Sequence, residues 1–363
     1  MLLEDMIKER CLPPLSTREE MQEILQREEY GYLPAADVAT VRFGDTKILE
    51  ARVAPNGATL TCMDMTVENE YGSHTIPVHY ASIQDGKKHP LFIFLSFSQM
   101  MPNRYYPVEM IAERGFHVLS FSYIDATSDN DDFSNGVAPL LLPGGQKKGT
   151  DCGKIAMWAW CAMRVLDYAA TLPEIDMEQV AIIGHSRLGK TALYTGMMDT
   201  RFRYVFSNNA GCSGDALSRG NLGVRGEKGP YGKTGETIEV ITQRFPYWFC
   251  QNYRKYAKRN IPDTFDQHFL LAAIAPRFVS VAASAEDDWA DPVSEQLCCL
   301  AAGKQWEKMG LPGFIHNDAL LKPGETLQEG RVAFCMREGA HYLSYHNWLW
   351  NMDFIEQHKN DML

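Results

Sequence analysis

The segment Val180–Leu193 constrains this chain more than any other. Its sequence is Val-Ala-Ile-Ile-Gly-His-Ser-Arg-Leu-Gly-Lys-Thr-Ala-Leu. Four apolar residues, three of them β-branched, predict a buried strand, and the residues from Lys190 onward have the composition of a helix start. A serine on the turn between such a strand and helix has the geometry of a nucleophile elbow, with amide donors close enough to hold an oxyanion. We therefore predict that Ser186 is a nucleophile on an α/β sheet.

The glycines of this turn depart from the usual spacing. The common elbow is Gly-x-Ser-x-Gly, whereas here Leu188 takes the second position after the serine and the glycine follows at Gly189. Because ordinary turns also contain Gly-x-Ser-x-x-Gly, the prediction depends on the flanking strand and helix. A second candidate, Ser213 in Gly-Cys-Ser-Gly, precedes a weaker helix start, so we favour Ser186.

Composition bounds the class of protein. The chain has 363 residues, 45% of them hydrophobic, and a formal net charge of −11. Since α/β proteins of this length are often single units, we expect residues 1–363 to form one domain. The acidic balance and the lack of a lysine- or arginine-rich run argue against nucleic acid and anionic membranes as partners. The nine cysteines are scattered and form no Cys-x-x-Cys pair or Cys/His cluster, so we expect no metal site.

The beginning of the chain lacks the features of a signal peptide. Residues 1–8 are too acidic, and no apolar run in the sequence approaches the ~20 residues of a membrane span. We therefore expect a cytoplasmic protein that does not associate with membranes. The sequence leaves the oligomeric state open.

Strands and helices alternate along most of the chain, which predicts a three-layer α/β/α sandwich around a mostly parallel sheet. Residues 1–40 form a helical lead-in, with a capping-box pattern at Ser16–Glu20, and residues 40–83 suggest antiparallel strands. The later strands are predicted at Pro90–Leu95, Gly115–Phe121, Val180–Ile183, Tyr204–Ser207, Arg277–Ala282 and Val332–Cys335. Helices are predicted near Val108–Arg114, Lys154–Ala170 and Tyr345–His358.

Two segments interrupt this alternation. Residues 125–149 are rich in Asp, Asn, Gly and Pro and predict a long loop, and residues 220–234 form a glycine-rich insertion. Ligands of parallel sheets lie beyond the carboxyl ends of the strands, where Ser186 is predicted. We expect the 220–234 insertion to stand near the active site.

A serine nucleophile needs a base, and the base needs an acid that fixes its tautomer. In α/β-hydrolases the chain order is serine, acid, histidine. His341 follows the last predicted strand and is our candidate base. Four carboxylates in residues 285–292 follow another strand, and Asp287 is the first choice for the acid, with Asp288 and Glu286 as alternatives.

Several blocks along the chain together resemble a known family, the glucuronoyl esterases of carbohydrate esterase family 15, whose bacterial members are often named acetyl xylan esterase-like. The elbow reads Gly-x-Ser-Arg-x-Gly-Lys, as in that family. The other blocks are Gly31–Pro34, Asp129–Asp132, Gly235–Thr237, Phe245–Phe249, Asp266–His268, Ala275–Arg277 and Trp289–Pro292. The resemblance implies an α/β-hydrolase fold and hydrolysis, without metal or cofactor, of glucuronic acid esters that link xylan to lignin alcohols.

The resemblance also implies roles for individual residues. Ser186 is the nucleophile and His341 the base, while Arg187 would give its backbone N–H and its guanidinium to the oxyanion. The sugar contacts are expected from residues of three types, a cation, a carboxylate and an indole: Lys190, Glu236 and Trp289.

Two departures from the family pattern bear on the site. Many members carry the triad acid as a glutamate in Glu-Ser-Gly after the next strand, where this chain has Asn209-Ala210-Gly211. Asp287 lies two residues before Trp289, where some bacterial members have an alternative acid. The second departure is the 220–234 insertion, which would reshape the sugar site. Members of the family are also commonly secreted, whereas this sequence shows no signal.

We therefore expect a serine carboxylesterase that hydrolyses a carbohydrate ester, foremost a glucuronoyl ester of xylan-type sugars, through an acyl-enzyme. Deacetylation of xylo-oligosaccharides is the alternative within the same class. From another class, Asn209 favours an inactive carbohydrate-binding pseudo-hydrolase.

Overall fold

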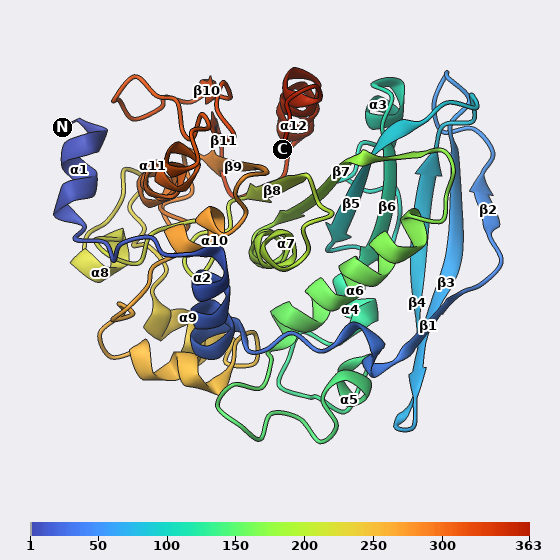
Figure 1. Cartoon of the computed structure of the whole chain (residues 1–363), viewed down its shortest axis with the longest axis horizontal. Helices are drawn as coiled ribbons and strands as arrows, with labels where there is room; N and C mark the ends of the chain where they lie inside the picture. Colours follow the sequence, from blue (N-terminus) through green and yellow to red (C-terminus); the bar gives the residue numbers. More distant parts are fainter. Residues whose placement is uncertain (1) are drawn as a thin grey trace.

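An eleven-stranded sheet runs through the computed structural model, which describes residues 2–363 (Figure 1). The strand order is β1-β3-β4-β6-β5-β7-β8-β9-β11-β10, and β2 pairs with β3 beside this path. The strands span β1 Thr40–Phe43, β2 Lys47–Glu50, β3 Thr59–Asn69, β4 Gly72–Ser82, β5 His89–Ser96, β6 His117–Ser122, β7 Ile175–His185, β8 Tyr204–Asn208, β9 Phe278–Ser284, β10 Thr326–Leu327 and β11 Val332–Arg337.

The centre of the sheet is parallel and its two ends are antiparallel. Strands β6, β5, β7, β8, β9 and β11 run parallel to one another, and Ile182 in β7 lies between Ile93 of β5 and Val205 of β8. Strands β1 to β4 form the antiparallel end, at the right of Figure 1. The prediction of antiparallel strands in residues 40–83 is therefore confirmed.

Helices cover both faces of this sheet. The α-helices span α1 Leu3–Glu9, α2 Arg18–Leu25, α3 Val108–Glu113, α4 Tyr123–Ala126, α5 Ala138–Leu141, α6 Lys154–Ala169, α7 Arg187–Met198, α8 Leu222–Arg225, α9 Ile238–Arg244, α10 His268–Ala272, α11 Pro292–Lys308 and α12 Tyr345–His358. Shorter helical turns are the π-helix η1 Gln26–Tyr30 and the 3₁₀ helices η2 Ala36–Val38 and η3 Gln251–Tyr256.

Alternate residues of the central strands enter two separate apolar clusters. In β7, Val180 and Ile182 join the cluster that contains the buried residues of α6, α7, α10 and α11, whereas Ala181 and Ile183 join the cluster of α3 and α12. This period of two explains why an unbroken apolar run forms a strand here, because both of its faces are covered. The result is the three-layer α/β-hydrolase fold that the sequence predicts.

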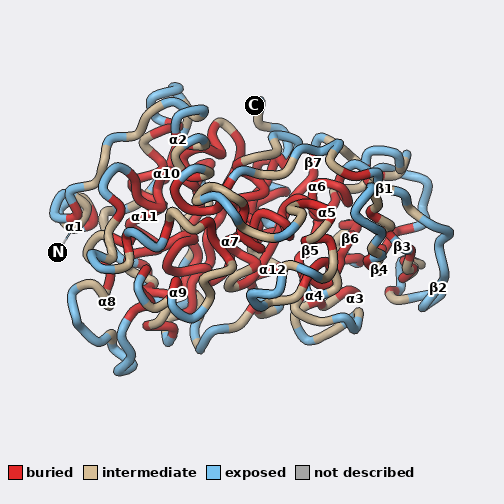
Figure 2. The backbone as a smooth tube through the Cα atoms, turned by 90° about the horizontal axis from the view of Figure 1, so that it is seen from below, coloured by how far each residue is buried: buried red, intermediate tan, exposed pale blue. Residues whose placement is uncertain are grey.

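The buried backbone is concentrated around the central strands, α6 and α7, and the outer strand β2 is exposed (Figure 2). The helix α6 is buried along nearly its whole length because it lies between the sheet and the N-terminal segment. Within residues 2–363, none of the helices combines the length and the apolar character that crossing a bilayer requires.

Some predicted boundaries are wrong. Strand β7 begins at Ile175, five residues before the predicted start, because Ile175 pairs with His89 of β5. A register shift separates this pair from the next one at Val180, across a stretch that contains the polar residues Asp176 and Glu178. The first long helix begins with a capping box of Thr17 and Glu20, as predicted, but it changes to the π-helix η1 after Leu25. The loop of residues 125–149 contains the short helix α5.

The close packing of α7 on β8 gives a test of the fold. A Cβ built on Gly196 of α7 would lie 2.2 Å from Cγ2 of Val205 in β8. We expect Gly196→Ala to lower the free energy of unfolding by about 1–3 kcal/mol, the usual cost of overpacking, as measured by urea denaturation. Gly44→Ala is the matched control, because its Cβ would have ordinary contacts of 3.6 Å or more. Equal stabilities of the two variants would contradict this packing.

Candidate active site

Ser186 occupies a sharp turn between the central strand β7 and the helix α7. Its φ and ψ are 58° and −128°, a region that residues other than glycine rarely adopt. The turn is fixed by the Ser186 N–H, which donates to the carbonyl of Asn208 at 2.8 Å. Gly184 permits it, since a Cβ there would lie 2.0 Å from the carbonyl oxygen of Leu188.

Packing explains why the second glycine of the motif stands at position 189 and not at position 188. A Cβ on Gly189 would lie 2.9 Å from Oγ of Ser207 and 3.1 Å from Cβ of Ala210, so at position 189 the helix packs closely against β8 and the turn that follows it. Leu188 is fully buried in the core instead. The elbow therefore needs its second glycine one place later than the common pattern.

His341 and Asp287 form a short hydrogen-bonded pair beyond the ends of β11 and β9. Nδ1 of His341 lies 2.6 Å from Oδ2 of Asp287. The same carboxylate oxygen accepts a bond of 3.0 Å from Nδ2 of Asn209, whose Oδ1 accepts from Ser284 at 3.1 Å. Asp287 is buried, whereas the His341 side chain is 40% exposed. This arrangement fixes the imidazole by Nδ1 and leaves Nε2 for a reacting group.

The other candidate acids and the other candidate serine have different surroundings. The Asp288 carboxylate accepts backbone N–H bonds from Tyr231 and Lys233 and so anchors the 220–234 insertion. Glu286 is exposed. Ser213 is fully buried, and its hydroxyl lies 2.7 Å from the hydroxyl of Tyr253. Of the three acids, Asp287 is the one that contacts His341.

All seven predicted site residues line one cavity of about 320 Å³. They are Ser186, Arg187, Lys190, Glu236, Asp287, Trp289 and His341. The 220–234 insertion contributes Lys233 to the lining. Four further residues with functional side chains were not predicted to line it: Asn209, Arg244, Phe245 and Trp248.

The Arg187 guanidinium is held by a carboxylate and an indole. It forms an ion pair with Asp129, and its Cζ lies 4.7 Å from the centre of the Trp248 ring. The Trp248 indole N–H in turn donates to Asp129 at 2.7 Å, which closes the group. Asp129 stands in one of the blocks that resemble the family, but nothing in the spacing of the sequence connects it with Arg187.

Lys190 and Glu236 form an ion pair at the bottom of the cavity. Their charged atoms are 3.8 Å apart, and both side chains are buried. Burial raises the pKa of the Glu236 carboxyl, and the charge of Lys190 opposes that shift. The Glu236 N–H donates to the carbonyl of Trp289 at 2.9 Å. A cation, a carboxylate and an indole thus face one space, a combination suited to sugar hydroxyls and an apolar sugar face.

His185, which precedes the serine, is a neutral neighbour of His341. The centres of the two imidazole rings are 4.5 Å apart, and Nδ1 of His185 lies 2.7 Å from Oδ1 of Asn208. Burial, together with the nearby His341, lowers the pKa of His185 to about 3. His185 therefore carries no charge that would repel a protonated His341. No pattern in the sequence indicates this role, because the residue is typical of the end of a strand.

The comparisons with known proteins agree with this geometry. The family model described as "Glucuronyl esterase, fungi" matches residues 64–310. This chain belongs to the glucuronoyl esterase family. The family resemblance that the sequence predicts is therefore confirmed.

Two curated relatives of this glucuronoyl esterase family member are longer proteins. A carbohydrate esterase of an unknown prokaryotic organism is 34% identical over 255 residues, which cover 69% of this chain and 55% of the relative. The 4-O-methyl-glucuronoyl methylesterase 1 of Wolfiporia cocos is 28% identical over 229 residues, 61% of this chain and 54% of that protein. The chain thus spans about half the length of the curated relatives it matches.

Solved glucuronoyl esterase structures share the fold over most of the chain. The glucuronoyl esterase from Solibacter usitatus superposes with a TM-score of 0.80 at 27% identity, covering 94% of this chain and 91% of that one. A promiscuous esterase of carbohydrate esterase family 15 from a marine bacterial metagenome superposes with a TM-score of 0.77 at 27% identity, again covering 94% of this chain and 91% of that one. The predicted fold class is therefore confirmed.

The burial of His185 predicts a pH dependence of stability. Above pH 6.5 the residue is neutral in both the folded and the unfolded chain. Below pH 6.5 His185 becomes protonated in the unfolded chain, whereas in the folded chain it becomes protonated only near pH 3. Because the unfolded chain binds the extra proton, His185 lowers the free energy of unfolding as the pH falls through this window. His185 contributes at most about 1.4 kcal/mol per pH unit to the slope of the free energy of unfolding against pH.

We expect the free energy of unfolding of the His185→Gln variant to decline less steeply than that of wild type between pH 6.5 and pH 4. Urea denaturation at a series of pH values measures this. The exposed His346 supplies the control His346→Gln, which should follow the wild-type curve. A His185→Gln curve parallel to that of wild type would contradict the neutral, buried state of His185.

Proposed function

We propose that this protein is a serine carboxylesterase that hydrolyses glucuronoyl esters of xylan-type sugars. The observation that carries the proposal is the 2.6 Å bond between Asp287 and His341 beside the Ser186 elbow, all lining one cavity. Ser186 attacks the ester carbonyl while Nε2 of His341 takes the hydroxyl proton. The Asp287 carboxylate holds Nδ1–H and stabilises the imidazolium that forms.

Arg187 stabilises the oxyanion of the tetrahedral intermediate. Its guanidinium supplies a charge-assisted hydrogen bond, which is stronger than that of a neutral amide. Asp129 and Trp248 hold the guanidinium in place before substrate arrives. When the intermediate collapses, the C–O bond to the alcohol breaks and His341 returns the proton to the leaving oxygen. Water then attacks the acyl-enzyme by the same route and releases the acid and free Ser186.

The acyl side of the cavity favours a sugar acid over an acetyl group. In a glucuronoyl ester the sugar carries the acyl carbon, so the sugar stays on Ser186 until water attacks. The buried pair of Lys190 and Glu236 offers hydrogen bonds that an acetyl group cannot use, and a cavity of about 320 Å³ far exceeds the size of acetyl. The curated relatives named 4-O-methyl-glucuronoyl methylesterases support the same substrate class.

A pair of esters tests the proposal. We expect wild-type protein to hydrolyse benzyl glucuronate with kcat/KM at least about tenfold above that for acetylated xylo-oligosaccharide, a difference of about 1.4 kcal/mol in the barrier. Ser186→Ala should lose both activities and should not react with a fluorophosphonate probe. A preference for the acetyl ester would indicate a deacetylase, and an unlabelled wild-type serine would indicate a binding protein without activity.

The role of Asp287 is tested by removing its charge without changing its shape. We expect Asp287→Asn to lower kcat by about 10⁴-fold, as loss of the acid does in other triads, because the amide cannot stabilise the imidazolium. Glu286→Gln is the control, since Glu286 is exposed and should leave kcat near the wild-type value. A loss of less than about tenfold in Asp287→Asn would move the role to another acid.

A further inference from the structure

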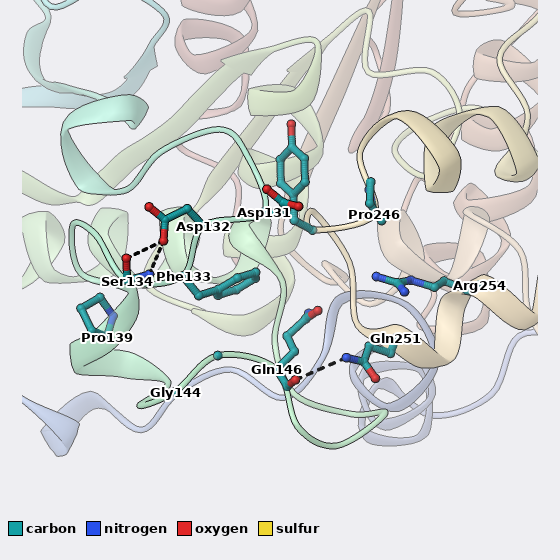
Figure 3. Close-up of a pocket in the computed structure, with 12 residues that line it drawn as sticks. Asp131, Asp132, Phe133, Ser134, Pro139, Gly144, Gln146, Pro246, Gln251 and Arg254 are labelled. Carbon is teal, nitrogen blue, oxygen red and sulfur yellow. Dashed lines mark hydrogen bonds between the residues drawn. The ribbon is translucent and has the colours of Figure 1, made fainter.

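The structure has a second cavity (Figure 3), whose volume of about 630 Å³ is larger than that of the active-site cavity. Its lining comes from the loop of residues 131–134, from residues 144–146 and from the segment that leads into the 3₁₀ helix η3. Figure 3 shows Phe133 and Arg254 on opposite sides of this space, with Gln146 between them. The volume lies within the range of about 300–1,000 Å³ that is typical of small-molecule sites.

The two cavities share one wall. In the segment of residues 245–248, Phe245 and Trp248 line the active-site cavity, whereas Pro246 and Tyr247 line the second one. The second cavity has another wall, the loop of residues 131–134, which follows Asp129, the partner of the active-site residue Arg187. The Tyr247 hydroxyl joins the two walls by donating to the Asp129 carbonyl at 2.8 Å. The two cavities therefore adjoin at the segment of residues 245–248.

The second cavity holds polar groups that the protein leaves free. Within the described part of the chain, neither the Arg254 guanidinium nor the Asp131 carboxylate has an ion pair or a hydrogen bond. Gln251 donates to the carbonyl of Gln146 at 3.4 Å, which leaves its amide oxygen available. The Phe133 ring supplies an apolar face, and Nζ of the buried Lys154 lies 4.6 Å from the centre of this ring.

We propose that this second cavity binds a neutral stretch of the xylan-type chain that carries the reacting ester. The inference rests on the proposed function, since it extends that function from the reacting sugar to the chain attached to it. Aromatic and proline rings contact the apolar faces of pyranose sugars, while a guanidinium, a carboxylate and amides bond their hydroxyls. The reacting uronic acid occupies the first cavity, and the chain crosses the shared wall.

The charges of the cavity favour a neutral ligand over an acidic one. Two carboxylates, Asp131 and Asp132, face a single cation, Arg254. Hydrogen bonds from Ser134 and Asn135 lower the pKa of Asp132 to about 2, so this carboxylate stays charged at neutral pH. A second acidic sugar would meet net negative charge, whereas xylose units carry none.

The test is calorimetric titration of the intact protein with xylohexaose, which contains no ester and so needs no catalysis. We expect wild-type protein and Ser186→Ala to bind it, and we expect Arg254→Ala and Phe133→Ala each to weaken binding by about tenfold. Phe133→Leu, which keeps an apolar side chain of similar bulk, should recover part of the loss. Arg259→Ala is the matched control, because Arg259 is a nearby exposed arginine paired with Asp263 and lies outside the cavity. Lack of binding to wild-type protein, or equal binding by all variants, would overturn the proposal.

A kinetic comparison separates this proposal from the proposed function. For each variant we compare kcat/KM for an ester carried on a xylo-oligosaccharide with kcat/KM for benzyl glucuronate. We expect Arg254→Ala and Phe133→Ala to lower the ratio of the two values by about tenfold through KM, and a constant ratio would overturn the proposal. If wild-type protein hydrolyses neither ester, the proposed function fails while the xylohexaose titration still decides whether the cavity binds a neutral chain.

Discussion

The backbone at Ser186 is the constraint on which the rest of the site depends. A non-glycine residue at positive φ costs on the order of 1–3 kcal/mol, and it persists only where its surroundings fix it. Here the surroundings are the centre of a parallel sheet and a nearly buried helix, α7, joined by the Ser186 N–H bond to Asn208. The strand β8 ends in the same way, with Asn209 at a φ of 48°. Two adjacent strands therefore turn sharply at one edge and present a serine and an amide side by side.

The amide at position 209 and the carboxylate at 287 depend on each other. Asn209 donates to the oxygen of Asp287 that also meets His341, so a carboxylate at 209 would place two negative charges within hydrogen-bond distance. Two such groups share a proton, which raises the pKa of one of them and reduces the negative charge facing the histidine. The neutral asparagine adds no second negative charge beside Asp287. This physical link explains how a chain that departs from the family pattern at 209 can still present one charged acid to His341.

Much of the fold could be predicted because its strands are short apolar runs with both faces covered. The run Val180–Ile183 is an example, and its continuation to Ile175 was missed because polar residues at the rim of a sheet resemble a loop. Ser186, Asp287 and His341 could be predicted because each follows a strand end in the order that the chemistry needs. The other predicted site residues came from the family resemblance and from no local pattern: Arg187, Lys190, Glu236 and Trp289. The roles of Asp129 and His185 could not be predicted. The role of Asp129 depends on an ion pair with a residue 58 positions away, and that of His185 on burial beside the His341 ring, and neither produces a local sequence pattern.

The loop from Asp129 to Ser134 lies between two cations of different kinds. Arg187, at the active site, pairs with Asp129, and the buried Lys154 bonds Thr127 at 2.7 Å and the carbonyl of Asp132 at 2.8 Å. Burial lowers the pKa of Lys154 to about 8, which places it close to losing its charge just above neutral pH. The same loop thus carries the partner of Arg187 and, at residues 131–134, part of the lining of the second cavity. The proposed oxyanion contact of Arg187 and the proposed chain-binding cavity therefore depend on one loop.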